Sequence, residues 1–350
     1  MILYWLMFLL PAVATLVPLR GTPPLRRATW LLAGSVLVYL IGLRHQVGGD
    51  WYTYLELYDL QVDARFVDIS LTKGPGANAL DWFAATLGLG VYGANVISAL
   101  LFTVGLVVFC RQQPFPWLAL AVAVPYLVIV VAMGYTRQSV AIGFIFLALA
   151  ELRNANQFRF IVLILMGAAF HQTAFLMLPL GVLGSQARSS IRMLAIFGLF
   201  AVILLTIFLS RYDALWQNYV EAEMASEGGA IRVWMSAVAG VIMLLFRKRW
   251  RLLWPDAKLW TYISLLTLAC IPLVGLASTA VDRMALYFIP LQLVVYSRIP
   301  VLIPGTLART VSVVAILAAY AAVLFVWLNF ATHSGSWVPY NNVTFLLSTT

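Results

Sequence analysis

The feature that most constrains this chain is a succession of apolar runs, each close to the length of a membrane-spanning helix. A helix needs about 20 apolar residues to cross a bilayer. We predict about twelve crossings (about ten to fourteen), with the sixth and seventh expected as half-helices that meet near Phe170–His171–Gln172. The predicted crossings are residues 1–19, 28–44, 91–110, 116–133, 137–152, 159–171, 173–186, 191–210, 230–247, 258–277, 283–299 and 309–330.

The composition excludes most alternatives to a membrane fold. Of the 350 residues, 63% are hydrophobic and 10% are charged, whereas soluble proteins carry about 25% charged residues. Such a chain has too few polar side chains to cover a water-facing surface, which excludes a soluble enzyme, a disordered chain and a disulfide scaffold. Cys110 and Cys270 lie in separate apolar runs and indicate no metal site. We therefore predict an all-α polytopic membrane protein that forms a single transmembrane domain over residues 1–350.

The distribution of charge predicts the side of the membrane that each loop faces. If both termini lie outside, the inner side receives 15 of the 22 Lys and Arg residues and only two of the 13 acidic residues, Glu151 and Asp256. This distribution follows the positive-inside rule. Orientation and contact with anionic membrane lipid therefore explain the net charge of +9. No long polar segment is present that would bind nucleic acid.

The polar residues that can perform chemistry gather on the predicted outer side. Two outer loops are long, at residues 45–90 and 211–230. The first contains an amphipathic stretch near 76–90 that is too short to span a bilayer, and we expect a re-entrant or interfacial helix there. A functional site is therefore expected among the loops and helix ends of this side.

The first polar cluster, RHQVGGDWY, directly follows the second predicted crossing. Its adjacent glycines, Gly48 and Gly49, permit a tight turn and the close approach of a ligand. Arg44 can present a planar guanidinium to a phosphate. Asp50 can accept a proton or a hydrogen bond from a sugar hydroxyl. The alternative is an interfacial turn with a belt of aromatic residues, including Tyr52, and a snorkelling arginine.

Two further arginines lie where helices are predicted to begin at the outer side. Arg137 starts the fifth crossing and is followed by Gln138. Arg283 starts the eleventh crossing and is preceded by Asp282, with Tyr287 expected one turn later on the same face. A cation at a helix N-terminus opposes the helix dipole, so each arrangement becomes favourable when an anion such as phosphate binds there. The alternative is a boundary arginine that pairs with a nearby acid such as Asp282.

A third polar group, His171 and Gln172, separates two short apolar runs. Polar side chains are costly inside a bilayer and usually face a cavity, and a histidine can act as a general base near neutral pH. The alternative is a structural histidine whose hydrogen bonds are satisfied. No HExxH, DxD or paired-histidine spacing accompanies this group, so we expect neither a metal nor a cofactor.

These segments, taken in order, resemble the EpsG family within the broader Wzy-type polysaccharide polymerases. The similar segments are RHQVGGDWYTY at 44–54, GPGANALDWFAATLGLGVYGANVISALLFTVGLVVFCR at 74–111, GYTRQSVAIGFIFLALAEL at 134–152, FHQTAFLMLPL at 170–180, DRMALYF at 282–288 and SWVPYNN at 336–342. The resemblance covers most of the chain, whereas residues 188–260 carry no such motif.

The resemblance implies a GT-C-like membrane glycosyltransferase that makes exopolysaccharide at the outer (periplasmic) face of a bacterial plasma membrane. It implies that donor and acceptor are undecaprenyl-diphosphate-linked oligosaccharides, and that the growing glycan passes from its lipid carrier to the acceptor sugar hydroxyl. It also implies a metal-independent reaction. The expected partners are these lipids, together with a chain-length regulator and a flippase.

The resemblance and the chemistry together assign roles to the polar residues. Arg44, Arg137 and Arg283 are expected to bind the leaving diphosphate, and the last two to act in catalysis by stabilising its charge. Asp50 and His171 are alternative candidates for the base, or for positioning the acceptor hydroxyl. The expected supporting residues are Gly48, Gly49, Tyr52, Gln138, Gln172, Asp282 and Tyr287.

Other functions stay open as alternatives. A transporter or flippase of lipid-linked sugars would also need a polar outward cavity with arginines, although inverted repeats and polar residues at the midplane would then be expected. An O-antigen ligase differs mainly in its acceptor. A membrane O-acyltransferase would use a catalytic histidine, a role that His171 can fill.

Overall fold

The computed structural model describes residues 1–17, 21–69, 74–153, 156–183, 229–275 and 278–347, and the single residues 198, 202 and 206. Within these residues the chain is helical, apart from loops and an isolated β-bridge that joins Arg44 to Asn342. The predicted all-α class is therefore confirmed for this part of the chain. The predicted crossing at 191–210 and the outer loop at 211–230 fall almost entirely outside the described residues.

The chain divides into two compact units. Unit 1 comprises Met1–Leu147, Met166–Gln172 and Tyr296–Thr350, and unit 2 comprises Ala148–Leu165 and Thr173–Val295. The single transmembrane domain stays a prediction.

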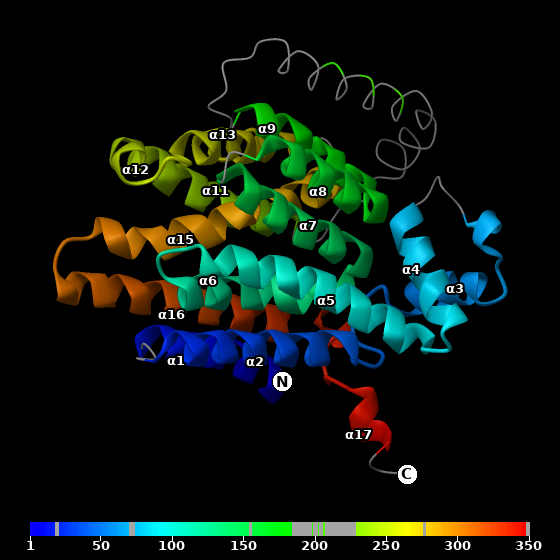
Figure 1. The fold of residues 1–350 in the computed structure, drawn as a ribbon. Helices are drawn as coiled ribbons and strands as arrows, with labels where there is room; N and C mark the ends of the chain where they lie inside the picture. The colour runs from blue at the N-terminus through cyan, green and yellow to red at the C-terminus, as the bar shows by residue number, and fades with distance from the viewer. Residues whose placement is uncertain are drawn as a thin grey trace. The chain divides into compact units, whose positions relative to one another are not determined.

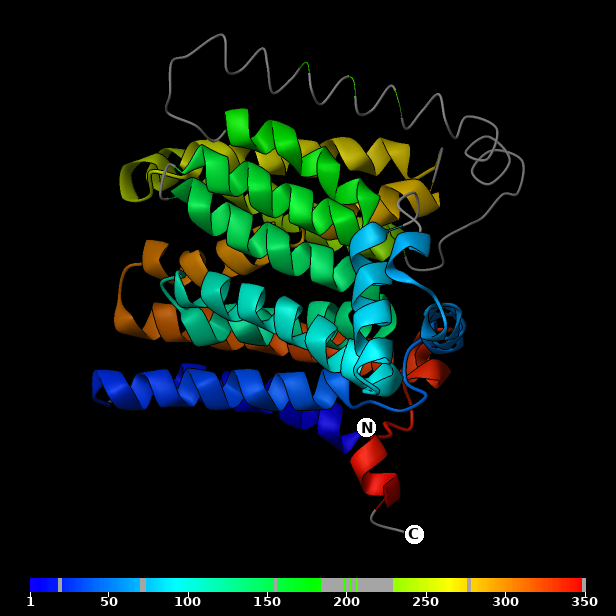
Figure 2. The same ribbon diagram turned by 45° about the vertical axis from the view of Figure 1, so that its right-hand side comes forward.

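Unit 1 is built from long apolar helices and several short ones. Its elements are α1 (Ile2–Leu16), α2 (Pro23–Gly42), α3 (Trp51–Val62), η1 (Phe66–Asp68), α4 (Pro75–Thr86), α5 (Gly90–Arg111), α6 (Pro116–Ala123), the π-helix η2 (Val124–Ala132), the first part of α7 (Thr136–Arg153), the last parts of α8 (Gln157–Phe170) and α15 (Pro290–Leu302), α16 (Thr306–Phe330), η6 (Ser334–Ser336) and α17 (Val343–Leu347). Figures 1 and 2 show α1, α2, α5, α6 and α16 running alongside one another, with α3 and α4 near one end of α5.

The helices of unit 1 pack through stacked aromatic rings and through small residues at their crossings. Trp30 of α2 stacks on Trp117 of α6 with ring centroids 4.0 Å apart. Gly105 of α5 and Gly143 of α7 lie at a close crossing, where a Cβ atom on either glycine would overlap the backbone of the opposite helix. Small residues at such crossings are typical of membrane helices, which associate through close van der Waals contact.

Within the described residues, four helices are long and apolar enough to cross a membrane. They are Pro23–Gly42, Gly90–Arg111, Val281–Leu302 and Thr306–Phe330, and the shorter apolar helices are Ile2–Leu16, Pro116–Ala132, Gln157–Phe170, Ile231–Leu245 and Ala257–Leu273. Each coincides with an apolar run that the sequence marks as a crossing. The number of twelve crossings and the outside location of both termini stay predictions.

The helix that starts as α6 continues as the π-helix η2 after Ala123. Pro125 lies near the start of this segment and provides no backbone N–H. π-Helical segments are rare and are frequently found at functional sites. The carbonyl oxygen of Ile129, inside this segment, accepts a hydrogen bond from the indole Nε1–H of Trp337 at 2.9 Å. The irregular helix therefore contacts the C-terminal segment just before α7 begins.

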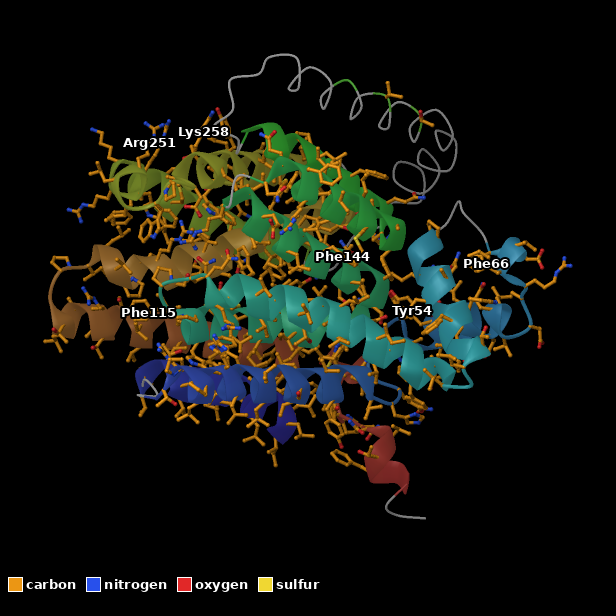
Figure 3. The ribbon with its side chains drawn as sticks, viewed as in Figure 1. Tyr54, Phe66, Phe115, Phe144, Arg251 and Lys258 are labelled. Atoms are coloured by element: carbon orange, nitrogen blue, oxygen red, sulfur yellow. The ribbon has the colours of Figure 1, made fainter. Side chains whose placement is uncertain are left out.

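Unit 2 contains the helices that pack on α11. Its elements include η3 (Gln172–Met177) from Thr173 onward, α9 (Leu178–Leu183), α11 (Gly229–Leu245), α12 (Arg247–Leu253), α13 (Ala257–Leu273), α14 (Ser278–Ala285) and η5 (Leu286–Phe288). Both α13 and α14 contact α11. The side chains of Arg251 in α12 and Lys258 in α13 are exposed (Figure 3). They belong to the cations that we predict to face the inner membrane surface.

Two local features differ from expectation. Residues 51–62, expected as part of a long loop, form α3, because Trp51 and Tyr58 fall on one helix face and are both buried. The helix expected to begin at residue 283 begins instead at Ser278 as α14. No glycine or proline lies between Ser278 and Arg283 to delay its start.

Candidate functional site

Three segments that are far apart in the sequence meet in unit 1: the segment after α2, the start of α7 and the segment after α16. The backbone N–H of His45 donates to the carbonyl oxygen of Asn341 at 3.0 Å, and that of Gly48 donates to the carbonyl oxygen of Ser336 at 2.9 Å. The C-terminal segment SWVPYNN is therefore part of the structure around the first polar cluster.

Trp337 is the side chain that joins these segments. It is buried, and a Cβ atom at Gly134 would overlap its ring. The hydroxyl of Tyr4 in α1 donates to the carbonyl oxygen of Trp337 at 2.6 Å. Together with the bond to Ile129, these contacts connect the C-terminal segment to α1, to η2 and to the approach to α7.

Arg44 lies inside this assembly, with 1% of its surface exposed. Its Nε donates to Val47 O at 3.2 Å, its Nη1 to Ile41 O at 2.6 Å, and its Nη2 to Thr136 Oγ1 at 2.7 Å. Burial lowers the pKa of Arg44 to about 10, so it stays protonated at neutral pH. These contacts favour a positioning role, linking the end of α2 to the start of α7, over the direct contact with diphosphate that we expected.

Arg137 lies in the first turn of α7, as the sequence indicated. Its Nη2 donates to Asn78 Oδ1 at 3.1 Å and to Asp81 Oδ2 at 3.3 Å, both in α4. Gly74, with φ of 69°, turns the chain into α4, and Pro75 occupies the first position of that helix. The Nε–H of Arg137 is buried and has no hydrogen-bond partner among the described residues. The guanidinium can therefore donate a further hydrogen bond from Nε to an acceptor that binds in the pocket.

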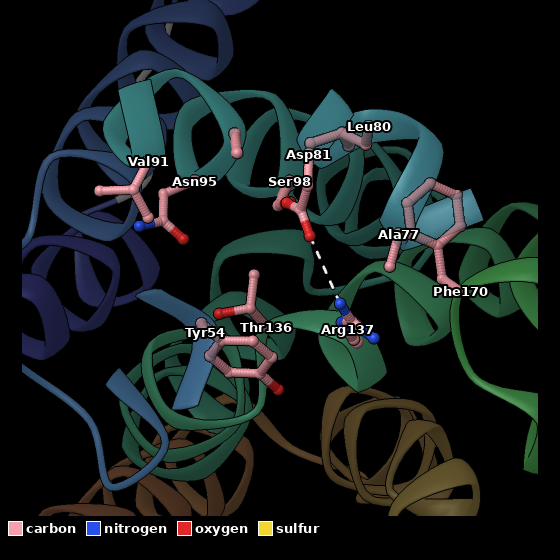
Figure 4. A pocket seen from close by; sticks show the side chains of 11 residues that line it. Tyr54, Ala77, Leu80, Asp81, Val91, Asn95, Ser98, Thr136, Arg137 and Phe170 are labelled. Atoms are coloured by element: carbon pink, nitrogen blue, oxygen red, sulfur yellow. Dashed lines mark hydrogen bonds and ion pairs between the residues drawn. The ribbon is translucent and has the colours of Figure 1, made fainter. Parts of the chain in front are cut away.

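A small pocket, with a cavity volume of about 20 Å³, surrounds this ion pair (Figure 4). Figure 4 shows the carboxylate of Asp81 directed at the guanidinium of Arg137, with Tyr54 and Thr136 nearby. The lining residues are Tyr54, Ala77, Leu80, Asp81, Val91, Ala94, Asn95, Ser98, Thr136, Arg137 and Phe170. An apolar wall with a few converging polar groups is typical of a small-molecule site.

The electrostatics of the pocket favour proton exchange at one group. Burial raises the pKa of the Asp81 carboxyl to about 6, while the charge and hydrogen bond of Arg137 limit the rise. Burial and the negative charge of Asp50 raise the pKa of Tyr54 above its usual value, and a backbone hydrogen bond from Arg137 opposes that rise. Tyr54 therefore stays neutral at physiological pH, whereas Asp81 can gain and lose a proton there.

The other candidates of the first two clusters do not line the pocket. Asp50 immediately precedes α3 and is close enough to Tyr54 to affect its pKa. Tyr52 is exposed, and Gln138 is buried in α7. A Cβ atom at Gly49 would contact the Trp337 ring. None of these four candidates is among the lining residues.

His171 and Gln172 lie where the α-helical geometry of α8 ends and η3 begins, at the predicted break between two short helices. Both side chains are partly buried. The preceding residue, Phe170, lines the pocket, and its carbonyl oxygen lies close to Gly74. His171 is therefore adjacent in sequence to the pocket wall but is not itself a lining residue.

The candidates of the distal motif lie in unit 2. Because α14 begins at Ser278, Arg283 lies in its last turn, and its side chain is exposed. However, α14 is followed directly by η5 and α15, and Val281–Leu302 form one helix long enough to cross a membrane. Arg283 therefore lies near the start of a continuing helix, and an anion opposite it stays a prediction. Tyr287 lies in the 3₁₀ segment η5, is buried and accepts a hydrogen bond from Thr173 at 2.9 Å. It therefore does not share the exposed face of Arg283, because the helix geometry changes between them.

Asp282 is paired with Arg232 of α11, a residue to which the sequence assigned no role. The Nε and Nη2 of Arg232 donate to the two carboxylate oxygens of Asp282. The two side chains are 13% and 11% exposed. A two-point pair of this kind is strong and geometrically specific, and it ties α14 to α11.

Replacing Asp282 by asparagine is expected to destabilise the fold by about 3 kcal/mol, because it removes the two-point carboxylate partner of the nearly buried Arg232. The thermal unfolding midpoint of the purified protein should fall by several degrees. The matched control is Asp68→Asn, which breaks the exposed Arg65–Asp68 pair and should leave the midpoint nearly unchanged. Equal midpoints for the two variants would contradict this interpretation.

No sequence motif singled out Asn78 and Asp81, which hold Arg137. Both belong to the segment GPGANALD, which was part of the resemblance, but two polar residues in an amphipathic stretch also fit a solvated helix face. Arg232 was missed because its segment carries no motif. Within the described ranges, no group of three His, Cys, Asp or Glu side chains is placed to hold a metal ion.

Comparison with known proteins identifies a family. The model of the EpsG family matches residues 27–342, a range that includes α2, the pocket and the segment SWVPYNN. No curated protein and no solved structure matches the chain.

Proposed function

Because this chain belongs to the EpsG family, we propose that it joins undecaprenyl-diphosphate-linked oligosaccharides into exopolysaccharide at the outer face of a bacterial plasma membrane. Family membership and the apolar helices identify an exopolysaccharide polymerase-type membrane protein with glycosyltransferase-like character. The lipid carrier, the outward orientation and a metal-independent reaction are the further parts of the proposal.

The observation that carries the proposal is the environment of Arg137. Its guanidinium lies in the pocket at the start of α7, already contacts one carboxylate, and keeps a buried Nε–H without a partner among the described residues. A guanidinium and a helix N-terminus together favour an anion. The leaving diphosphate of a lipid-linked sugar is such an anion.

The proposed reaction needs a cation that stabilises the leaving diphosphate and a base that accepts the proton of the acceptor hydroxyl. The pocket contains groups for both. As the bond between the sugar and the diphosphate breaks, negative charge builds on the leaving group, and a fixed cation lowers the barrier without a metal. Arg137 is proposed for this role, with Arg44 fixing the helix end through Thr136.

The experiment that tests the function is polymerisation by the purified full-length chain. The protein in lipid nanodiscs would receive lipid-linked repeat units extracted from the producing bacterium, with EDTA present, and the products would be resolved by gel. A ladder of glycans is expected. Unchanged substrate that moves across proteoliposomes would instead identify a transporter, and acyl transfer without a ladder an acyltransferase. Activity that EDTA abolishes would contradict metal independence.

A further inference from the structure

We propose that Asp81 is the proton acceptor of the polymerisation reaction, and that its carboxylate occupies the anion site of Arg137 until the donor diphosphate replaces it. This inference rests on the proposed function. It assigns to Asp81 the role of base, for which Asp50 and His171 were the candidates from the sequence. It follows from the position of Asp81 in the pocket, from the geometry of its contact with Arg137, and from the groups around it.

The contact between Asp81 and Arg137 is suited to exchange. It consists of one hydrogen bond at 3.3 Å from Nη2, whereas charge-assisted bonds of this kind usually measure about 2.7–2.9 Å and are often two-point. The same Nη2 also donates to Asn78 at 3.1 Å. If the carboxylate leaves, Asn78 still holds the guanidinium in place. A diphosphate, with more charge and more acceptor oxygens, can therefore displace the carboxylate.

Asp81 is also the carboxylate that lines the pocket. The side chain is 17% exposed and has Ala77, Leu80, Val91 and Ala94 as neighbours in the pocket wall. An apolar wall strips water from a carboxylate and makes it a stronger base toward a bound hydroxyl. Neither Asp50 nor His171 is a lining residue, so each would act on the acceptor from outside the pocket.

The proposed step balances in atoms and charge. The oxygen of the acceptor sugar hydroxyl forms a bond to the anomeric carbon of the donor glycan, and the bond from that carbon to the diphosphate oxygen breaks. The hydroxyl proton moves to the carboxylate of Asp81, and the electron pair of the broken bond leaves with the diphosphate, which Arg137 binds. The protonated Asp81 then releases its proton to water and returns to Arg137 when the lipid diphosphate departs.

The pH dependence of the reaction should report on Asp81. The charged and titratable groups around it are Arg137 from α7, Tyr54 and Tyr58 from α3, and Asp59 beside Tyr58. The lining residues from α5 carry no titratable group, and the nearest such residue to the Phe170 wall in sequence is His171. A base must be ionised, so kcat/KM should rise with pH through a pKa of about 6 and then level off, because this ratio reports the pKa values of the free enzyme.

The decisive variant is Asp81→Asn, measured in the polymerisation assay. We expect kcat to fall by about 10²- to 10⁴-fold, as for the loss of a general base, with an unchanged or lower KM for the donor lipid. The acidic limb of the pH profile should disappear in the residual activity, and Asp81→Glu should recover part of the rate. A rise in KM with the limb intact would assign Asp81 to structure and overturn the proposal.

A binding measurement tests the exchange without polymerisation. Farnesyl diphosphate serves as a soluble probe for the leaving lipid diphosphate. Asp81→Asn should bind it about two- to fivefold more tightly than the wild type, because the competing carboxylate is gone, and Arg137→Gln should bind it more weakly. Weaker binding by Asp81→Asn would contradict the exchange.

The matched control is Asp68→Asn, an exposed acid in η1 that lies outside the pocket lining. It should match the wild type in rate, pH profile and probe binding. If the wild type forms no ladder, the proposed function fails. If the wild type forms a ladder and Asp81→Asn forms the same ladder at the same rate, only the role of Asp81 fails.

Discussion

Replacing Arg137 by lysine is expected to reduce the rate of polymerisation by about 10²- to 10³-fold, the usual cost of removing one group that stabilises developing charge. Lysine keeps the positive charge but is a point charge on a flexible stem, and it cannot donate from two fixed directions as guanidinium does. The donation to Asn78 and the buried Nε–H both depend on that planar geometry. The measurement is the length and amount of glycan formed by the purified variant.

The control for this prediction is Arg65→Lys, at an arginine that pairs with Asp68 on an exposed surface. It should form the same glycan ladder as the wild type. The level and thermal midpoint of Arg137→Lys should stay close to those of the wild type, because its ion pair with Asp81 is partly exposed and keeps a cation. Wild-type chain lengths from Arg137→Lys would refute the assignment of the diphosphate to this residue.

Replacing Gly48 by alanine is expected to prevent correct assembly of unit 1, with a loss of about 3 kcal/mol or more. Gly48 has φ of 105°, a conformation that costs an L-residue roughly 1–2 kcal/mol. Its Cβ would also overlap the carbonyl oxygen of Met133, and overpacking typically adds about 1–3 kcal/mol. The yield of monodisperse protein and its thermal midpoint should both fall sharply, and polymerisation should fall with them.

The adjacent glycine provides the matched control. At Gly49 a Cβ atom would lie 3.7 and 3.8 Å from two atoms of the Trp337 ring, which is ordinary van der Waals contact, and no positive φ is required there. Gly49→Ala should therefore fold and polymerise nearly as the wild type does. If the two alanine variants have the same yield, thermal midpoint and polymerisation, backbone strain and overlap do not explain why position 48 is a glycine.

The sequence predicted most of the polar clusters that contribute to the candidate site. It did not predict which side chains of these clusters contact one another. Arg137 was found because a cation at a helix start is unfavourable without an anion, and α7 does begin at Thr136. The same reasoning selects Arg283, which was expected to start a helix. In the structure α14 begins five residues earlier, at Ser278. Packing as well as local sequence signals determines where a helix begins and ends. An argument from the helix dipole needs the position of the helix start, which the sequence alone locates only to within a few residues.

Arg44 shows the opposite limit. Its residue type and its glycine-rich neighbourhood suggested an exposed phosphate ligand, yet its side chain is buried and donates to two carbonyl oxygens and a hydroxyl. Burial depends on the segments that close over a residue. Here these include the segment that pairs with Arg44 at Asn342, which lies almost at the other end of the chain.

The sequence by itself determined that this is a helical membrane protein, where its apolar helices lie and where its polar clusters fall, because hydropathy and helix periodicity are properties of neighbouring residues. Only the tertiary structure decided which polar residues meet. Asp81 reaches Arg137 across 56 positions, Arg44 reaches Thr136 across 92, and Trp337 reaches Ile129 across 208. Contacts at such separations follow from the packing of helices, which no local pattern in a single sequence encodes.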